Sequence, residues 1–424
     1  MRPAPVRRKG GAYPRRPTGV RFPGRMRRLT LNYLKTESGA GLLLLAAAAL
    51  AVVIANSPDG DRYFAFAAAP IPVRIGAFAE TLSLAGWVKT ALMPVFFLVL
   101  GMQIKFELLR GELSNPRRLA LPAAAALGGL VVPAVVFLAV NRSAGAPGVW
   151  PAAGATDLGV ALAVLALVGP ALPSSLRVLL MGVALADDLV ALAVGAAFSA
   201  DRLNWGMLAG AGVVLAALAL LSRWRRAPFL FYAAGFVLVW GFVLKSGLDV
   251  SLAGVAAAFT APIGMRRPGH ESTLKYFMDS LHPYVAFAVL PLFVFTAAGC
   301  SLRDVSLADL TKPVPLGLVL ALWTGKPLGV FGFSWLATVL KLARRPTGAA
   351  WAELLGVAML CGVGLTVSLF LVALTPGPGG REQAAVRLAI LAGSVLSAAS
   401  GAALLSWAQG RRTTWGEDAV LGRP

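Results

Sequence analysis

The amino-acid sequence predicts an all-α polytopic membrane protein with about twelve transmembrane helices, and two observations support this fold class. Of the 424 residues, 58% are hydrophobic and only 14% are charged, whereas soluble globular domains are about 45–50% apolar and about 25% charged. Apolar segments of about 17–25 residues, the length of a helix that crosses a hydrocarbon core, recur along the chain. No segment large enough for a soluble domain remains between them.

Three regions are expected: a basic, disordered cytoplasmic tail at 1–38, a transmembrane domain at 39–408, and a cytoplasmic C-terminal tail at 409–424. Residues 1–35 contain eleven of the 39 Lys and Arg residues and no acid. This Arg-, Pro- and Gly-rich composition is typical of a disordered arm that lies against anionic lipid. Nucleic-acid binding, the alternative for so basic a segment, is disfavoured because no recognisable binding motif accompanies the charge.

The apolar segments predict the helices in order along the chain. A basic region before an apolar one is also typical of a signal peptide, but here the basic region is much longer than usual, so we expect an uncleaved first span. If both termini lie in the cytoplasm, the cytoplasmic loops and adjoining helix ends hold fourteen Lys and Arg residues, not counting the tails, and the opposite loops hold eight. This excess on the cytoplasmic side is what the positive-inside rule predicts. The twelve helices are expected at residues 39–56, 86–104, 119–140, 150–168, 174–198, 205–222, 228–244, 248–263, 284–300, 314–340, 351–375 and 383–408.

Two of these helices are interrupted by residues that disfavour a continuous helix. The fourth contains Thr156 and Asp157 between glycines, and the eleventh contains Gly362 and Gly364 followed by Thr366. Each alone is compatible with helix packing through small residues. Interruptions at corresponding places in two halves of a transporter instead indicate a binding site near the bilayer midplane, and the presence of Asp157 favours this interpretation.

Two adjacent carboxylates, Asp187 and Asp188, interrupt the apolar run of the fifth helix. A charge at membrane depth costs about 2.5–3.5 kcal/mol on insertion scales and marks a functional site by default. An Asp pair that caps a soluble helix is the alternative, and the apolar residues on both sides disfavour it. Two carboxylates in a low dielectric cannot easily both stay charged, so this pair is suited to hold either protons or a cation.

Lys326 is the buried cation of the sequence, and without a partner it would lose its proton, so we expect it to pair with a carboxylate. If the two interrupted helices break near each other, four half-helix ends meet. Asp157 beside the amino-terminal ends and Lys326 beside the carboxy-terminal ends would then neutralise the helix dipoles. Lys89, Glu353 and Arg387 lie near the starts of their helices, where they can reach the interface, and we interpret them as structural.

At these residues the sequence resembles the NhaA family of sodium/proton antiporters, from about residue 30 to residue 410. The resemblance implies twelve helices, with helices 3–5 and 10–12 related as inverted repeats and the discontinuous helices 4 and 11 crossing near the midplane. It is specific because the motifs occur together in order. They are Ala155-Thr-Asp157, Ala186-Asp-Asp-Leu189, Leu244-Lys-Ser-Gly247, Leu281-His-Pro283, Leu290-Pro-Leu-Phe293, Gly325-Lys-Pro-Leu-Gly329 and Cys361-Gly-Val-Gly-Leu-Thr366.

The resemblance also implies residue roles. Asp187, Asp188 and Thr156 would bind the transported Na⁺ or Li⁺, with Asp188 as a direct ligand, and Lys326 would form a salt bridge with Asp187 when no sodium is bound. Thr156 and Asp157 match the break in helix 4. Deprotonated carboxylates would bind the ion from the cytoplasm, and external protons would displace it after the site reorients. This implies electrogenic exchange without a cofactor.

The chain departs from the family pattern where the family carries residues tied to pH activation. Gln103 stands where an acid is common and Phe106 where an arginine is common. Met278 and Asp279, just before His282, likewise stand where an acid and a histidine occur in some relatives. The predicted pH-sensing region consists of Gln103, Glu107, Asp279 and His282. The resemblance further implies a homodimer in the bacterial inner membrane, which is the plasma membrane of the cell, with residues 63–81 as the candidate contact.

Other classes of protein share some of these residue patterns. A passive cation channel also selects cations with carboxylates, and a carrier of the same fold could transport a different solute, although an organic anion would need an Arg clamp that this site lacks. An intramembrane aspartyl protease needs a Gly-x-Gly-Asp pattern, whereas Leu365 follows Gly364. A metalloprotease needs His-Glu-x-x-His, and Leu274 stands at the second histidine position after His270. Both enzyme classes are disfavoured.

Overall fold

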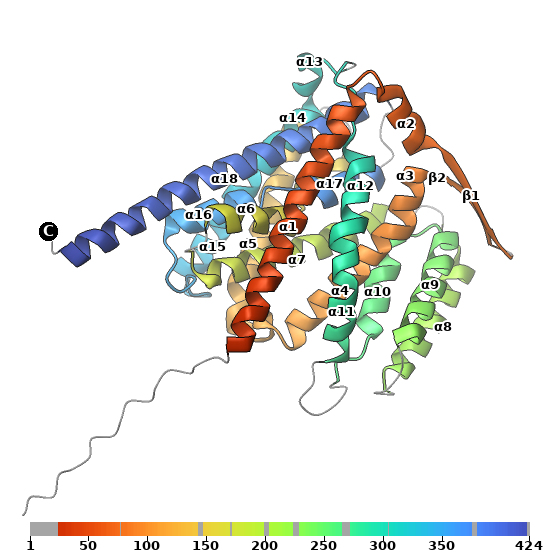
Figure 1. Ribbon diagram of the computed structural model, residues 1–424, viewed down its shortest axis with the longest axis horizontal. Coiled ribbons are helices and arrows are strands. Elements are labelled where there is room, and N and C mark those ends of the chain that lie inside the picture. The colour runs from red at the N-terminus through yellow and green to blue at the C-terminus, as the bar shows by residue number, and fades with distance from the viewer. Residues whose placement is uncertain are drawn as a thin grey trace, which may run out of the picture. The chain divides into compact units, whose positions relative to one another are not determined.

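A computed structural model gives the architecture of the chain (Figure 1). The chain divides into two compact units, residues 1–36 and residues 37–424. The second unit contains every residue of the candidate site. The structure describes residues 24–76, 78–142, 147–169, 172–198, 203–223, 229–264, 272–303, 305–374 and 380–421.

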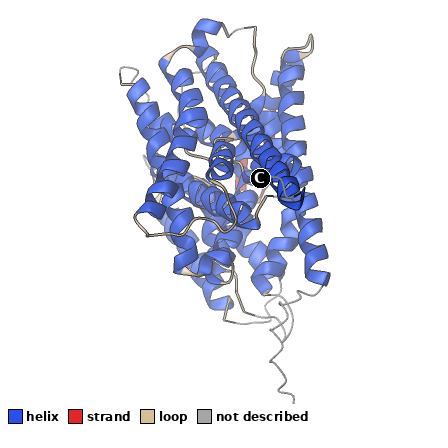
Figure 2. Cartoon of the chain, turned by 90° about the vertical axis from the view of Figure 1, so that its left-hand side faces the viewer, coloured by secondary structure: helices blue, strands red, loops and turns tan. Residues whose placement is uncertain are grey.

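The described residues are almost entirely helical, and one two-stranded sheet is the only sheet among them (Figure 2). Each of the twelve predicted ranges contains helix, so the predicted all-helical polytopic class is confirmed. By length and composition, seven helical segments of the described chain can cross a membrane, or nine if two bent helix pairs each count as one span. The full count of twelve spans stays a prediction.

The N-terminal helix α1 (Gly24–Ala55) begins earlier than the sequence predicts. Residues 24–38, which the composition assigns to the tail, are helical, and residues 1–23 lie outside the described residues. After α1 the chain bends by 115° into α2 (Gly60–Ala68). At the other end, α18 (Arg381–Leu421) continues through most of the segment that was expected to be the C-terminal tail.

A β-hairpin follows α2 and was not predicted. Strand β1 (Pro70–Ile75) pairs antiparallel with β2 (Phe78–Ser83), with Pro70 opposite Ser83. The segment lacks regular alternation of apolar and polar residues, and the two prolines of β1 cannot donate to a ladder, so they suit an edge strand only. Lys245 of α9 (Phe229–Ser246) forms an ion pair with Glu80 of β2, and in Figure 1 the hairpin runs past this end of α9.

Three long helical segments contain a wide, π-helical turn just before a proline. Proline lacks the N–H that would bond to the preceding turn, and its ring crowds that turn, so the helix widens there. One of these turns, η6 (Ala321–Gly325), directly precedes Lys326. The segments are α3 (Leu84–Trp87), η1 (Val88–Leu92) and α4 (Met93–Leu109); α11 (Thr273–Tyr284), η5 (Val285–Val289) and α12 (Leu290–Ala298); and α14 (Pro313–Leu320), η6 (Ala321–Gly325) and α15 (Lys326–Val339).

The buried side chains form three hydrophobic clusters. One joins α5, α7 and α15 to α16 (Trp351–Leu360), another joins α4 to α8, α9, α10 and α11, and a third includes Ala155 and Val363 of the two interrupted helices. Figure 1 shows α8 and α9 side by side at one edge of the helices. The bounds of the remaining elements outside the site are α5 (Pro116–Val140), α7 (Ser174–Phe198), α8 (Trp205–Leu221), α9 (Phe229–Ser246), α10 (Ser251–Thr260), η2 (Glu112–Ser114) and α13 (Leu307–Leu310).

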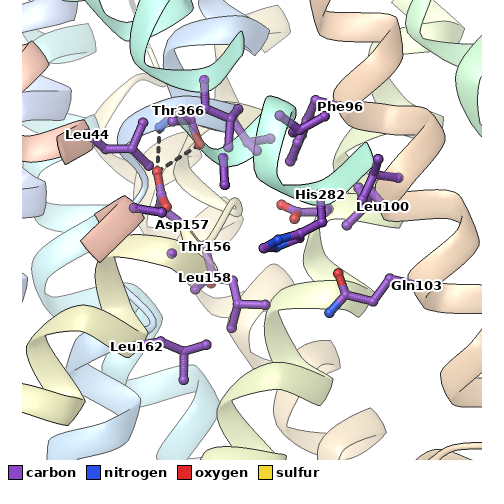
Figure 3. A pocket seen from close by; sticks show the side chains of 18 residues that line it. Leu44, Phe96, Leu100, Gln103, Thr156, Asp157, Leu158, Leu162, His282 and Thr366 are labelled. Carbon is purple, nitrogen blue, oxygen red and sulfur yellow. Dashed lines mark hydrogen bonds between the residues drawn. The ribbon is translucent and has the colours of Figure 1, made fainter. Parts of the chain in front are cut away.

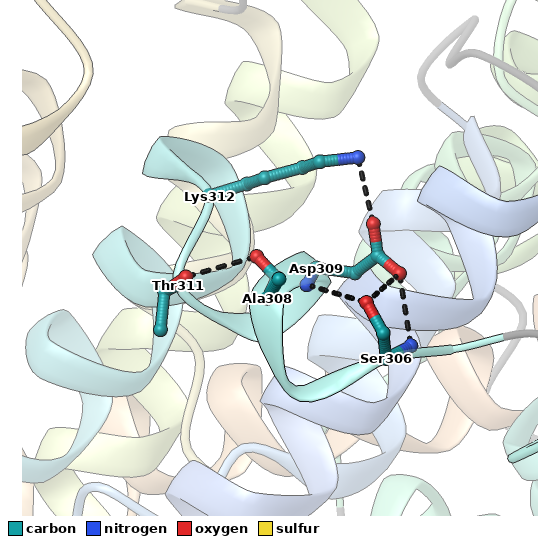
Figure 4. Close-up of polar contacts among 5 residues, drawn as sticks. All are labelled: Ser306, Ala308, Asp309, Thr311 and Lys312. Carbon is teal, nitrogen blue, oxygen red and sulfur yellow. Dashed lines mark hydrogen bonds and ion pairs between the residues drawn. The ribbon is translucent and has the colours of Figure 1, made fainter.

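The short helix α13 is held by a capping box at its first turn (Figure 4). The Asp309 amide donates to Ser306 Oγ at 3.3 Å, and Asp309 Oδ2 accepts from the Ser306 amide at 2.9 Å. Lys312 Nζ lies 2.7 Å from Asp309 Oδ1. These contacts satisfy the amide groups that a helix start leaves without intrahelical partners, and they define the turn that leads into α14.

Candidate functional site

Both interrupted helices are broken, and their breaks lie against each other. The first break, Gly154–Asp157, separates η3 (Pro147–Ala153) from α6 (Leu158–Val168). The second break, Cys361–Gly364, separates α16 (Trp351–Leu360) from α17 (Leu365–Leu374), which bend by 40°. The amide of Asp157 donates to the carbonyl of Val363 at 2.6 Å. Non-helical backbone at membrane depth needs such partners, because lipid offers none.

The glycines of the second break are required by close approach. A Cβ on Gly362 would lie 2.3 Å from the Leu322 carbonyl oxygen, and one on Gly364 would lie 2.4 Å from Ser368 Oγ. The amide of Gly364 donates to Ser394 Oγ at 3.1 Å, which ties this break to α18. Larger residues at Gly362 and Gly364 would therefore separate the break from its neighbours.

Asp157 caps the amino-terminal ends of both half-helices. Its Oδ1 accepts from the Val160 amide of α6 at 3.2 Å, and its Oδ2 accepts from the amide and the hydroxyl of Thr366 in α17, at 3.1 and 2.7 Å (Figure 3). The positive ends of two helix dipoles thus meet one buried carboxylate. This is the position that the sequence predicted for Asp157.

Two different side chains donate to the carboxy-terminal ends. Lys326 is fully buried at the start of α15; its Nζ lies 2.8 Å from Asp187 Oδ2 and donates to the carbonyl of Gly154, which follows η3. The hydroxyl of Thr156 lies 2.9 Å from the Cys361 carbonyl oxygen, which follows α16. Lys326 therefore contacts one carboxy-terminal end, and Thr156 contacts the other.

Room for Lys326 comes from a pair of glycines in α5 that the sequence did not single out. A Cβ on Gly128 would lie 2.2 Å from the Gly329 carbonyl oxygen, so α5 and α15 cross with their backbones in contact. A Cβ on Gly129 would lie 3.6 Å from Lys326 Cε and 2.8 Å from a methyl group of Val330. Adjacent small residues at a helix crossing were the signal that could have revealed this contact.

Asp187 and Asp188 lie in different surroundings although they are neighbours. Asp187 Oδ2 is close to Lys326 Nζ and to Thr156 Oγ1, each at 2.8 Å. A hydroxyl carries one proton, so Thr156 can donate to Asp187 or to Cys361, but not to both at once. Among the described residues, no group donates to the buried Oδ1 of Asp187 or to that of Asp188. Buried acceptors of this kind favour a proton or a cation.

A cavity of about 90 Å³ connects the ion-binding candidates with two of the predicted pH-sensing residues. Asp188, Asp157 and Thr156 line it, together with Gln103 of α4 and His282 of α11. Figure 3 shows Gln103 and His282 on the side of the cavity opposite Asp157 and Thr366. Asp188 therefore faces the cavity, whereas Asp187 faces Lys326.

The other two predicted pH-sensing residues lie outside this lining. Glu107 follows Gln103 by one turn of α4, and Asp279 precedes His282 by one turn of α11. Both make polar contacts elsewhere. Of the four predicted pH-sensing residues, Gln103 and His282 therefore line the cavity together with Asp188, and Glu107 and Asp279 do not.

Comparison with known proteins covers nearly the whole chain. The family model described as Na⁺/H⁺ antiporter 1 matches residues 31–405. The Na⁺/H⁺ antiporter NhaA of Campylobacter concisus is 44% identical over 379 residues, which are 88% of this chain and 92% of that protein. The NhaA of Pseudomonas putida is 42% identical over 385 residues, 90% of this chain and 98% of the relative. The NhaA of Bordetella bronchiseptica is 43% identical over 392 residues, 90% of this chain and 97% of that protein. The chain therefore belongs to the NhaA family of Na⁺/H⁺ antiporters.

Proposed function

We propose that the protein is a secondary active antiporter that exports Na⁺ or Li⁺ in exchange for external H⁺. The observation that carries this proposal is the division within the buried carboxylate pair. Asp188 faces the cavity with an oxygen that no described residue donates to, while Asp187 is paired with Lys326. One carboxylate is thus available for a cation, and its neighbour can release a protein partner to join it.

The coupling follows from competition for the same oxygens. When both carboxylates are deprotonated, Na⁺ binds Asp188, and Asp187 exchanges Lys326 for the ion, with the Thr156 hydroxyl oxygen as a further ligand. After the site reorients, protons arriving from outside occupy the carboxylates, and the ion leaves. If both carboxylates take up protons for each cation released, one net positive charge enters per cycle, so the membrane potential also drives export.

A passive channel is the alternative to alternating access. A channel keeps a continuous path across the membrane, whereas a carrier closes one side of its site while the other is open. A channel cannot couple the sodium and proton gradients, so uphill movement of sodium driven by a proton gradient separates the two.

The membrane location and assembly belong to the same proposal. The protein is multi-pass. The proposed inner-membrane location rests on the family resemblance, and the proposed cytoplasmic placement of both termini rests on the loop charges. The basic tail would lie against anionic lipid. The β1–β2 hairpin falls in the segment expected to mediate a homodimer, and a two-stranded sheet has edges that a second copy can extend.

The test is antiport in everted membrane vesicles from cells that lack sodium/proton antiporters. After respiration has acidified the vesicle interior, added Na⁺ or Li⁺ should dissipate the pH gradient, and K⁺ should not. An imposed pH gradient should also accumulate sodium against its concentration gradient. Vesicles without the protein are the control. Sodium movement that is only downhill would contradict antiport and support a channel.

Electrogenicity is tested in proteoliposomes with and without valinomycin and potassium, which clamp the membrane potential. A potential of the physiological sign should accelerate sodium export at zero pH gradient. Exchange that is independent of the potential would contradict the uptake of more than one proton per cation.

A further inference from the structure

A second cavity lies away from the ion site, where three elements end or begin. It is bounded by the start of α5, the start of α7 and the segment that follows α15, and its volume is about 890 Å³. Ser175 Oγ of α7 donates to the carbonyl of Thr347 at 3.0 Å, so the wall formed by α7 is tied to the segment after α15. The antiport mechanism uses none of its residues.

The side chains of this cavity favour an anion. Arg118, Lys341 and Arg344 contribute three positive charges, and no described lining residue is acidic. Ser174 adds a hydroxyl group that can donate to an oxygen ligand, whereas the hydroxyl proton of Ser175 is already donated to Thr347. Two guanidinium groups, an ammonium and a hydroxyl are donors that proteins use for phosphate groups.

Lys341 has a backbone conformation that suits glycine better. Its φ is +59°, and it is the only non-glycine residue with a positive φ in the part of the chain that the structure describes. At this position α15 ends, with the amides of Leu342 and Ala343 donating to the Ala337 carbonyl at 2.9 and 3.1 Å. Helices ending in this way normally have glycine here, because a side chain adds strain. A strained backbone at a lysine that lines the basic cavity is a reason to test whether its amine has a function.

We propose that this cavity binds the phosphate of an anionic phospholipid headgroup. Apolar side chains such as Leu121, Val178 and Leu342 line the same cavity as the cations, which suits the glycerol and acyl end of a lipid better than a free ion. The cavity also joins α7, which carries the Asp pair, to the end of the helix that Lys326 begins. A bound headgroup would hold these two helices together.

The experiment measures thermal unfolding of the purified full-length protein in detergent while phosphatidylglycerol or phosphatidylcholine is added at low salt. Phosphatidylglycerol should raise the melting temperature and phosphatidylcholine should not. Each basic residue near an anionic lipid strengthens binding roughly fivefold, so Arg118→Gln/Arg344→Gln should weaken the response about thirtyfold. The matched control is Arg110→Gln/Arg223→Gln, which removes two exposed arginines that do not line the cavity.

A second variant keeps the proposal testable if the double variant folds poorly. Lys341→Gly relieves the backbone strain, so the melting temperature without lipid should be unchanged or higher, while the affinity for phosphatidylglycerol should fall about fivefold. An undiminished response in Arg118→Gln/Arg344→Gln, or an equal loss in the control, would overturn the site. A shift produced as strongly by inorganic phosphate would overturn the lipid as its occupant and identify a free anion. None of these measurements depends on transport.

Discussion

Two buried carboxylates of the same site, Asp157 and Asp188, are surrounded in opposite ways. Asp157 accepts three hydrogen bonds, from the Val160 amide and from the amide and hydroxyl of Thr366. Asp188 has an oxygen to which none of the described residues donates. Both line the same cavity, so their exposure to an entering ion is similar and only their partners differ.

The difference separates a carboxylate that holds the breaks together from one that can exchange its occupant. Donors to Asp157 come from the backbone of two helices and cannot leave without unfolding them, so its charge is permanently compensated. None of the described residues donates to Asp188 Oδ1, so a proton or a cation is suited to compensate its charge. Asp187 stands between these cases, because its partner Lys326 is a flexible side chain that can be replaced.

The largest effect is expected from Asp188→Asn. The substitution removes the charge that a cation would balance, an interaction of roughly 3–5 kcal/mol when buried, so sodium-dependent exchange should fall about a hundredfold or more. The melting temperature should stay the same or rise, since an uncompensated buried charge is removed. The measurement is the vesicle assay with expression-matched membranes. Full exchange in this variant would remove Asp188 from the site.

The second effect is expected from Lys326→Ala, which leaves Asp187 buried without its partner. Breaking a buried pair in this way costs roughly 3–5 kcal/mol, so the melting temperature should fall, and the pH dependence of exchange should change before exchange is abolished. Lys326→Ala/Asp187→Asn should recover part of the stability, because the lone charge is gone as well. Unchanged melting together with complete loss of transport would show that Lys326 acts in the exchange itself.

A third effect is expected from substitutions of Asp157, the carboxylate that holds the two breaks together. Asp157→Ala leaves the Val160 and Thr366 donors without an acceptor, which should destabilise the protein by about 2–4 kcal/mol. Asp157→Asn keeps one acceptor oxygen and should lose less. Thermal unfolding in detergent measures both variants beside Asp188→Asn. If Asp188→Asn were less stable than both Asp157 variants, the division between a structural and an exchangeable carboxylate would be wrong.

A smaller effect is expected at the cavity wall. Gln103→Glu adds a negative charge to the cavity that Asp188 lines, so proton binding to the Asp pair becomes more favourable and half-maximal exchange should move up by about one pH unit or less. Glu107→Gln, one turn away and outside the lining, is the control and should leave the profile nearly unchanged. A shift of equal size but opposite direction in Glu107→Gln, which removes a negative charge, would favour a general charge effect.

The smallest effect is expected at Asp309, which provides a reference outside the membrane spans. The hydrogen bond from Lys312, followed by those from Ser306, holds the pKa of Asp309 well below its usual range. Such a group stabilises the fold above its unfolded pKa of about 4 and loses this contribution as the pH falls toward its folded pKa. Asp309→Asn should therefore lower the melting temperature slightly at neutral pH, and the difference from the unchanged protein should shrink below about pH 4. If the difference in melting temperature persists below pH 4, the stabilisation comes from the hydrogen bonds of the capping box and not from the charge of Asp309.

The helical class and the position of the two breaks could be predicted from the sequence because they depend on local composition. A run of apolar residues as long as the bilayer is thick has few alternatives to a helix. Glycines beside Asp157, and again at Gly362 and Gly364, weaken the helix locally, and their occurrence in two halves of the chain together with Asp157 indicated the breaks. Helix α1 begins before residue 39 and α18 continues past residue 408, because polar residues can also continue a helix, which local composition does not exclude.

Contacts between distant segments could not be predicted in the same way. The Gly128–Gly329 crossing and the strained turn at Lys341 depend on which helices become neighbours. The β1–β2 hairpin was also missed, since its strands carry no alternation strong enough to indicate a register. Of the four residues predicted to sense pH, only the packing of α4 against α11 decides that Gln103 and His282 reach the cavity.

By itself the sequence determined that this chain crosses a membrane, that two of its helices break, and that three acids and one lysine share a dry interior. These properties follow from the cost of placing each residue type in lipid, which is local. The tertiary structure alone decided which acid receives which donors. That Asp157 caps two helices, Asp187 meets Lys326 and Asp188 faces the cavity depends on how segments more than 100 residues apart are packed together.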